Sequence, residues 1–416
     1  MNATQVIGDA GEKPAVIGRR RAMVLFMVAF LTWMLTNMDQ SLFGYAVPDL
    51  IREFDISIDH VGMLISLCYV AGIASAMAGG ILTDLFGPRW TLPICLGVSA
   101  ALVGAQGLVT GVAAFSILRV AAYGFSAALS PICNAVVANA VSDKHRPLLM
   151  ATLQCAYPMG WFVASFLVAP LISGFGWRMP FLVVFGVVPI AMLFWWLLPK
   201  GNPARASVQT IESVTPDEPR MHPVRELWME HRSKALLGAL AFFLYGGAAA
   251  GTVFYLPTFF REVRGYDAET ATYIVGLSYG ISMIGYFGSG LVSQTLFSRR
   301  TTTIIWMLAA AVGLLMMIWL PTSVGQDIAM FSGAAIFFFG TSAILTVYLV
   351  EIFPKHIRAT ATGICASGGI SAGSALFPML VAHFTHSLGW QMSLTIVIVP
   401  LLVLSAIVTW AMPKDR

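Results

Sequence analysis

Two charged residues, Asp39 and Arg119, stand inside long apolar runs of the sequence. A charge within a lipid-spanning segment is costly unless it is paired, neutralised by a proton or exposed to a water-filled cavity. An aspartate in such a place can carry a proton, and an arginine can donate two parallel hydrogen bonds to a carboxylate. The two residues therefore indicate either a permanent structural ion pair or the proton and anion sites of a transporter.

Polar residues continue from both charges at helical spacing, which favours a binding site over an isolated ion pair. Around Asp39 they are Thr32, Thr36 and Gln40, followed by Phe43. From Arg119 the same helical face contains Tyr123, Ser126, Ser130 and Asn134, a polar stripe over about four turns. A stripe of this length is not expected to face lipid, although its serines could also form hydrogen bonds between helices.

The protonation of Asp39 and the occupancy of Arg119 are expected to be coupled. Burial disfavours the carboxylate form of Asp39, whereas a nearby guanidinium favours it. A substrate anion on Arg119 would therefore favour protonation of Asp39, which is the chemistry of a proton symporter. In its predicted helix, Asp39 lies about 25 Å from the N-terminal end and about 9 Å from the C-terminal end. Arg119 lies about 11 Å from the N-terminal end of its own helix, which is on the same side of the membrane as the C-terminal end of the first, so the two charges are expected at similar depth.

The composition indicates that the elements carrying these residues span a lipid bilayer. Charged residues make up 11% of the 416-residue chain, against about 25% in soluble domains, while hydrophobic residues make up 58% and the mean hydropathy is +0.80. Soluble catalysis and nucleic-acid binding are therefore not expected. Apolar runs predict an all-α polytopic membrane protein with 12 transmembrane helices near residues 22–47, 60–81, 91–110, 112–140, 148–172, 179–198, 235–259, 270–293, 302–320, 328–350, 358–384 and 391–412.

Basic residues predict the orientation of these spans. Nineteen of the 24 lysines and arginines lie in the termini, the central linker and the loops of the same side, four lie on the opposite side, and the last is Arg119. By the positive-inside rule both termini and the linker are cytoplasmic, in a cytoplasmic (inner) membrane. The predicted parts are a tail (1–21), a six-helix bundle (22–198), a linker (199–234) with a short surface helix near 222–232, a second bundle (235–412) and a tail (413–416).

Two short sequences recur at a separation of about 212 residues, which predicts two related halves. Gly176-Trp177-Arg178 recurs as Gly389-Trp390-Gln391, and the stretch 143–146 corresponds to 354–358. Transporters built from six plus six spans place their substrate near mid-membrane between the halves, where rocking of the halves opens the site alternately to each side.

The loop after the second span carries a family signature. The stretch 80–89, GILTDLFGPR, resembles the motif of the major facilitator superfamily, and the second half keeps only the basic end of that motif, at 299–300. In that family this loop forms a cytoplasmic gate, which implies gating roles for Asp84 and Arg89. Ordinary loop charges would account for Arg89 but not for an acid at a helix end. The resemblance extends the gate to Glu351 and Arg358 in the second half.

A second stretch, NMDQ at 37–40, resembles the helix-1 element of the anion:cation symporter family, whose members include uptake systems for sugar acids. Here a single residue separates the asparagine from the aspartate, and Gln40 stands where that family has an arginine. That family also has a glutamate one or two turns after the helix-4 arginine, where this chain has Tyr123 and Ser126. The second acidic site of that family is therefore missing here. The resemblance implies either that one proton moves per cycle, through Asp39, or that the chain belongs to a neighbouring branch such as the sialate or aromatic-acid proton symporters.

Further substrate-binding candidates are polar and aromatic residues predicted to face the space between the halves. They are Asn37, Gln40, Tyr69, Tyr123, Gln154, Tyr157, Tyr279, Ser282, Ser367 and Ser371, and further aromatic candidates are Trp161, Tyr245 and Tyr255. Gln154 and Tyr157 on the fifth span are three residues apart and share a helical face, and so do Tyr279 and Ser282 on the eighth span. Packing, or a place at the membrane interface, is the alternative role for each of them.

The sequence thus predicts a secondary active transporter, a monomer that takes up a small organic anion together with protons. The anion would be a monocarboxylate, a sugar acid or an aromatic acid. The alternative is a proton-coupled antiporter that exports drugs or metabolites. Exporters of this fold often have a glycine-rich motif with Gly-Pro in the fifth span, where this chain has only Pro158-Met159-Gly160, so the sequence favours uptake.

An enzyme is not expected, and neither is a metal or another cofactor. The five cysteines lie in apolar stretches without metal-binding spacing. The seven histidines lie in loops or at helix ends, and no HExxH, CxxC or Ser/His/Asp arrangement occurs.

Overall fold

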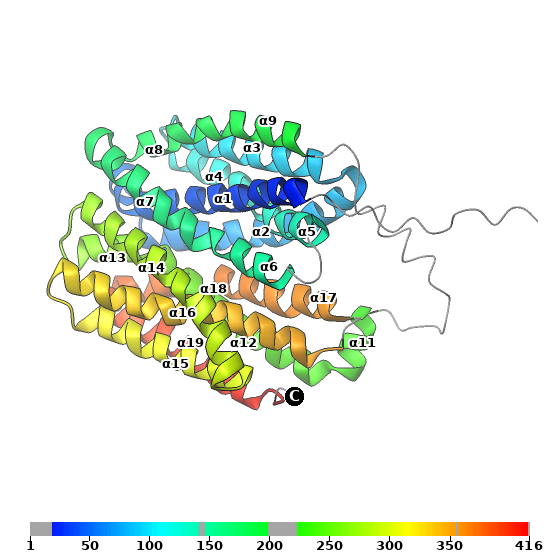
Figure 1. The fold of residues 1–416 in the computed structure, drawn as a ribbon. Coiled ribbons are helices and arrows are strands. Elements are labelled where there is room, and N and C mark those ends of the chain that lie inside the picture. The colour runs from blue at the N-terminus through cyan, green and yellow to red at the C-terminus, as the bar shows by residue number, and fades with distance from the viewer. Residues whose placement is uncertain (1–18, 141–145, 199–222, 355–356, 415–416) are drawn as a thin grey trace, which may run out of the picture.

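The computed structural model describes residues 19–140, 146–198, 223–354 and 357–414, which are almost entirely helical. Figure 1 shows two stacked bundles, with α1 to α9 in the upper one and α11 to α19 in the lower one. The described chain begins and ends at the right of the figure, which we call the terminal side, and we call the opposite end of the helices the distal side.

The first bundle contains the first six predicted spans, and the structure divides three of them. Its elements are α1 (Arg19–Phe54), α2 (Ile58–Phe86), α3 (Pro88–Gln106), α4 (Val112–Ala127) followed by α5 (Leu129–Ala140), α6 (Arg146–Gln154) followed by α7 (Ala156–Phe175), and α8 (Arg178–Val183), the 3-10 turn η1 (Val184–Gly186) and α9 (Val187–Leu197).

The second bundle begins with a short surface helix where the sequence predicts one. Its elements are α11 (Pro223–Glu230), α12 (Arg232–Val253) followed by α13 (Leu256–Glu262), α14 (Ala268–Thr295), α15 (Arg299–Trp319), α16 (Val324–Ile352), α17 (Arg358–Ala361), the π-helical turn η3 (Thr362–Gly368), α18 (Gly369–Leu388) and α19 (Trp390–Ala411).

Within the described residues, 11 helices are long and apolar enough to cross a membrane. The predicted third span corresponds to α3, which packs against α4 and α9 inside the first bundle. Arg89 lies in its first turn and Gln106 at its end, so it contains no 18-residue stretch as apolar as those of the 11 spans. The α3 helix thus takes the place of the third predicted span.

The first helix is longer than the sequence predicts. It continues through Pro48 to Phe54, seven residues beyond the expected end. Proline is tolerated inside membrane helices because neighbouring groups satisfy the backbone carbonyl that loses its partner. Asp39 therefore lies 15 residues, or about 22 Å, from the distal end of α1. The expected depth of about 9 Å is wrong, because the proline does not end the helix.

The repeated Gly-Trp sequence makes the same contact in both bundles. The glycines before Trp177 and Trp390 have φ angles of 80° and 77°, which a residue without a Cβ adopts at little cost. The indole Nε1 of Trp177 donates a hydrogen bond to Glu53 at the end of α1, and that of Trp390 donates to Glu262 Oε2 at the end of α13, at 2.7 Å. The two copies therefore close the distal end of their own bundles by equivalent hydrogen bonds.

Three helix pairs carry most of the contact between the bundles: α1 with α13, α2 with α18, and α7 with α14. Glycines bring the helices close together. A Cβ built on Gly276 of α14 would lie 1.9 Å from Ser165 Oγ of α7, and one on Gly62 of α2 would lie 3.0 Å from Ala382 Cβ of α18. Both glycines lie in the distal parts of their helices, so the bundles are closely packed on the distal side.

An ion pair joins the bundles on the same side. Arg261 of α13 donates two hydrogen bonds to the carboxylate of Asp49 on α1, from Nη1 and Nη2 to the two oxygens, both at 2.9 Å. A bidentate arginine–carboxylate contact is among the stronger ion pairs in proteins. It therefore reinforces the distal contact between α1 and α13.

The glycines of α14 allow a direct test of the helix packing. A Cβ on Gly285 would lie 1.9 Å from the backbone oxygen of Ile336 on α16, whereas one on Gly288 would meet nothing within 4 Å. We expect Gly285→Ala to lower the free energy of unfolding by about 1–3 kcal/mol, because the added methyl group overpacks the helix contact. Gly288→Ala is expected to be neutral or stabilising, because alanine favours the helix by about 1 kcal/mol. Thermal unfolding in detergent measures both, and an equal response of the two variants would contradict this packing.

Candidate functional site

A buried ion pair lies in the first bundle, where α1, α2 and α4 meet. Arg119 Nη1 of α4 donates a hydrogen bond to Asp39 Oδ1 of α1 at 3.3 Å. Asp39 is 6% exposed and Arg119 is 2% exposed. The structure therefore brings together the two charges that the sequence singled out, and it removes both from solvent.

The pair does not use the whole guanidinium. Arginine has five N–H donors, and Arg119 Nε has no hydrogen-bond partner within the described chain. The thiol of Cys68 on α2 lies beside the guanidinium, and the ring of Phe43 lies beneath it, 4.6 Å from Cζ. By contrast, Arg261 and Asp49 use two short contacts. The single, longer contact of Arg119 leaves donors available for an anion.

Aromatic side chains connect this pair to the second bundle. Phe43 contacts Phe254, which follows α12, with ring centroids 6.2 Å apart. Tyr69 of α2 contacts Tyr123 of α4 at 5.1 Å and Phe254 at 6.4 Å, and it also lies next to Ser374 of α18. Two of the predicted residues, Tyr69 and Tyr123, are thus neighbours of the ion pair, at the place where the bundles meet.

A second aromatic group continues from Phe254. The rings of Trp161 on α7 and Tyr279 on α14 stack at 5.0 Å with an interplanar angle of 12°. Tyr279 also contacts Phe339 of α16 at 4.9 Å, and Phe339 contacts Tyr157 of α7 at 5.8 Å. The predicted residues Tyr157 and Tyr279 therefore belong to one aromatic cluster that draws on both bundles.

Other predicted residues lie elsewhere or are already satisfied. Asn37 is buried beside Gly160 of α7 and its Nδ2 donates to the backbone oxygen of Trp33 at 2.7 Å, while its Oδ1 has no partner among the described residues. Ser282 donates within its own helix to the backbone oxygen of Tyr279 at 2.6 Å. Gln40 is buried on α1, Gln154 is exposed at the end of α6, Ser367 is exposed in η3 and Ser371 is half-buried on α18.

The residues predicted as a gate make contacts within their own bundles. The guanidinium of Arg89 lies over the ring of Trp195 at 4.7 Å. Glu351 accepts a hydrogen bond from Arg299 Nε at 2.6 Å, and Arg358 Nε donates to the backbone oxygen of Phe353 at 3.1 Å. Asp84 belongs to the last turn of α2, and its side chain lies outside the described part of the structure.

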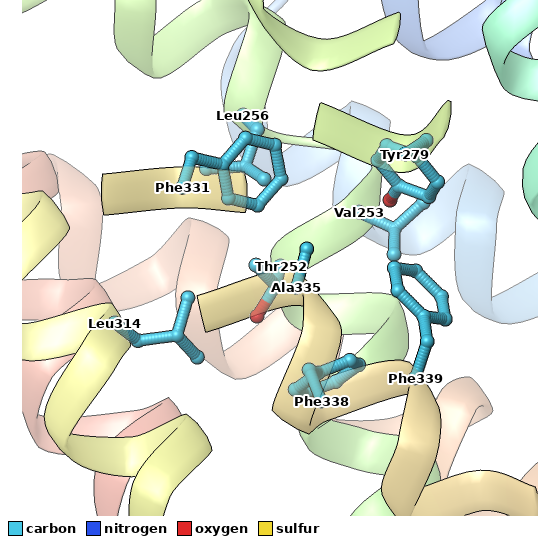
Figure 2. Close-up of a pocket in the computed structure, with 9 residues that line it drawn as sticks. All are labelled: Thr252, Val253, Leu256, Tyr279, Leu314, Phe331, Ala335, Phe338 and Phe339. Atoms are coloured by element: carbon cyan, nitrogen blue, oxygen red, sulfur yellow. The ribbon is translucent and has the colours of Figure 1, made fainter. Parts of the chain in front are cut away.

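A small cavity of about 10 Å³ lies beside the aromatic cluster, inside the second bundle, and has room for about one water molecule. Figure 2 shows Tyr279 and Phe339 on one side of it and Leu314 on the other. Its walls are apolar except for the hydroxyls of Tyr279 and Thr252, and Thr252 donates to the backbone oxygen of Ala248. This cavity is too small and too apolar to be the anion site itself.

Two bundles of apolar helices, with a buried charge pair and an aromatic cluster where they meet, define a multi-pass membrane protein. A family model described as "Major Facilitator Superfamily" matches residues 22–366, and the chain belongs to this superfamily. The predicted all-α fold of two six-helix bundles is thereby confirmed.

The chain is also similar to curated transporters. It is 25% identical over 375 residues to the cis,cis-muconate transport protein of Acinetobacter baylyi, with 88% of each chain covered. It is 25% identical over 393 residues to the gallate transporter of Pseudomonas putida, which covers 88% of this chain and 86% of that one. Over 70% of both chains it is 22% identical to the hexuronate transporter of Bacillus subtilis.

Solved structures share the fold. A bacterial homolog of the human lysosomal transporter Spinster, in an inward-facing and occupied conformation, has a TM-score of 0.76 at 16% identity, with 96% of this chain and 97% of that chain covered. A D-xylose-proton symporter has a TM-score of 0.72 at 20% identity, with 94% and 98% covered. At these identities the likeness concerns the fold alone.

The buried pair predicts strong energetic coupling between its two residues. Removing one charge leaves the other buried without a partner, so Asp39→Asn and Arg119→Gln are each expected to destabilise the protein, whereas the double variant removes both charges. We expect the double variant to be more stable than the sum of the single effects by about 1–3 kcal/mol. Unfolding of the four proteins in detergent measures this coupling. Additive effects would show that the two side chains do not interact.

Proposed function

We propose that this protein is a secondary active transporter that takes up a small organic anion together with one proton, by alternating access. The observation that carries the proposal is the buried Asp39–Arg119 pair, in which Arg119 Nε has no partner among the described residues, next to the place where Phe43 meets Phe254 of the second bundle. Arg119 is the anchor for the carboxylate of the substrate, and Asp39 is the proton site.

The charge balance of the site supports this pairing of an anion with a proton. Asp39 and Arg119 together carry no net charge when Asp39 is ionised. An anion bound to Arg119 makes the site negative, and a proton on Asp39 restores neutrality. Burying a net charge away from water is costly, so the bundles close readily over the unloaded site or over the site that holds both anion and proton.

Asp39 is favoured as the proton site by its place in the structure. In the described residues, the buried acids are Asp39 and Asp327. Asp327 lies near the distal end of the second bundle, where Tyr266 donates to it at 2.7 Å and Arg264 pairs with it at 3.4 Å. Asp39 is therefore the acid whose protonation responds to an anion on Arg119.

The nature of the substrate is supported by the relatives and by the aromatic cluster. The similar curated proteins are named as transporters of muconate, gallate and hexuronate, which are all organic acids. Tyr69 and Tyr123 offer aromatic faces and hydroxyl groups near the arginine, and Tyr157 and Tyr279 extend the aromatic surface between the bundles, which suits an unsaturated, aromatic or hydroxylated acid.

The remaining parts of the proposal concern topology. The excess of basic residues in the termini, linker and same-side loops supports cytoplasmic termini in a cytoplasmic membrane. The terminal side would then face the cytoplasm, where Asp84, Arg89, Glu351 and Arg358 would form the gate in another conformation. We propose that the transporter works as a monomer, because each chain contains both halves of the site.

Replacing Asp39 by asparagine tests the proton site. In Asp39→Asn the unloaded site carries a positive charge and the anion-loaded site is neutral, so only the loaded carrier crosses readily. In proteoliposomes we expect exchange of labelled organic acid to persist, while uphill uptake driven by a pH gradient falls to the level of protein-free vesicles. Asp55→Asn, in the exposed turn after α1, is the matched control and should behave as wild type. Uphill uptake by Asp39→Asn would contradict the assignment of Asp39 as the proton site.

The same charge balance predicts electroneutral transport of a monovalent anion. We expect an inward proton gradient to drive uptake into proteoliposomes, and a potassium diffusion potential, negative inside, to leave the initial rate unchanged at constant pH. Acceleration by that potential would mean that more than one positive charge accompanies each anion.

A further inference from the structure

Trp161 of α7 occupies a central place between the bundles. It is fully buried, and it is enclosed by three aromatic residues. It stacks on Tyr279 at 5.0 Å, and it meets Phe254 at 6.1 Å and Tyr45 at 5.7 Å edge to face. Two of these three neighbours, Tyr279 and Phe254, belong to the second bundle, so Trp161 lies on the surface where the halves meet.

The indole N–H of Trp161 has no hydrogen-bond partner among the described residues. A buried tryptophan normally finds an acceptor for this group, because leaving a donor unpaired away from water costs free energy. The same lack of a partner applies to Trp195 and Trp306. Trp195 lies beneath Arg89 in the first bundle, and Trp306 packs against Phe337 in the second. Of these three indoles, Trp161 is the one between the bundles.

Trp161 lies close to the anion anchor. Consecutive residues of α1 contact the two side chains: Phe43 lies beneath the guanidinium of Arg119, and a Cβ on Gly44 would touch the Trp161 ring at 3.3 Å. Phe254 contacts both Phe43, at 6.2 Å, and Trp161, at 6.1 Å. Two buried side chains with an unpartnered donor, Arg119 and Trp161, are thus connected through the rings of Phe43 and Phe254.

We propose that the indole N–H of Trp161 is a second anchor for the substrate, donating a hydrogen bond to an acceptor at the end opposite to the carboxylate on Arg119. This inference rests on the proposed function, since it takes the Arg119 anchor as given. The preferred substrates are then planar acids with an uncharged oxygen acceptor across the molecule, either a hydroxyl group or a second carboxyl group that is protonated, so that the loaded site stays neutral. An acid of the same shape with a methyl group in that place leaves the indole N–H unpaired and binds less tightly.

Matched pairs of ligands test this assignment on the full-length protein in detergent. 4-Hydroxybenzoate and 4-methylbenzoate differ in the acceptor, and so do cis,cis-muconate and sorbate, a six-carbon dienoate with one carboxylate. By titration calorimetry we expect wild type to prefer the acceptor-bearing member of at least one pair by about 3- to 10-fold, the value of one hydrogen bond to a neutral donor.

Variants of the tryptophans then locate the hydrogen bond. Trp161→Phe keeps a ring to stack on Tyr279 but lacks the N–H, so the preference should fall to about one while the affinity for the methyl-bearing acid stays unchanged. Trp306→Phe removes an equally unpartnered indole N–H elsewhere and should keep the preference. Trp161→His restores a ring N–H and should recover part of the preference.

Each result bears on one of the two proposals. Binding of both members of each pair by wild type without preference would overturn the Trp161 anchor and leave the Arg119 anchor standing. A preference that survives in Trp161→Phe would also overturn it, and the wild-type comparison decides the matter even if the variants do not fold. Failure of wild type to bind any of the four acids would contradict the proposed function itself.

Discussion

Net charge in the space between the bundles is the constraint on which this structure depends. The low-polarity interior strengthens the attraction between Asp39 and Arg119, and the same interior makes either charge alone expensive. The pair is neutral as a unit, so the second bundle can pack over it with aromatic rings instead of polar groups. Phe254 can therefore lie near the salt bridge without disrupting it, and it helps to keep water from weakening it.

The two ion pairs that involve α1 consist of the same residue types, but they have different roles. Asp49 and Arg261 lie near the distal rim, come from different bundles and make a short bidentate contact, so they hold the bundles together. Asp39 and Arg119 lie deeper, come from the same bundle and make one longer contact. A pair within one bundle keeps its partners together while the bundles move, and it can still exchange part of its contact for a ligand.

The sequence revealed the ion pair because charges inside apolar runs are rare, and most spans because apolar runs of sufficient length have few alternatives. Its repeat also marked Trp177 and Trp390 as equivalent positions, although not the glutamates that they contact. It could not single out Phe254 or Phe339, since a phenylalanine in a helix that is apolar all round faces lipid or the centre with equal ease. Only the packing shows which face turns inward.

Other differences have local causes. The fourth predicted span is divided into α4 and α5 at Ala128, because Pro131, near the start of α5, lacks the N–H that would otherwise bond to the backbone oxygen of Ala127. The apolar run continues through this proline, so its length alone predicts one helix over 112–140. Ser282 looked like a ligand contact by its spacing, but its hydroxyl bonds to its own helix, as serine hydroxyls readily do in apolar surroundings. Ser374, beside Tyr69, is one helical turn from the predicted Ser371 and was missed because small residues fill that whole stretch.

The distal contact between the bundles is built around glycines, and this has a consequence for the speed of switching. Where Gly62 and Gly276 meet the opposite bundle, the surfaces that part are largely backbone and small side chains, so opening requires few changes of rotamer. The delay in opening then comes from water that must enter a narrow apolar seam and from the release of the Asp49–Arg261 bridge. Both requirements act at a few distal contacts, so the two glycines and the bridge together determine how easily this side of the protein opens.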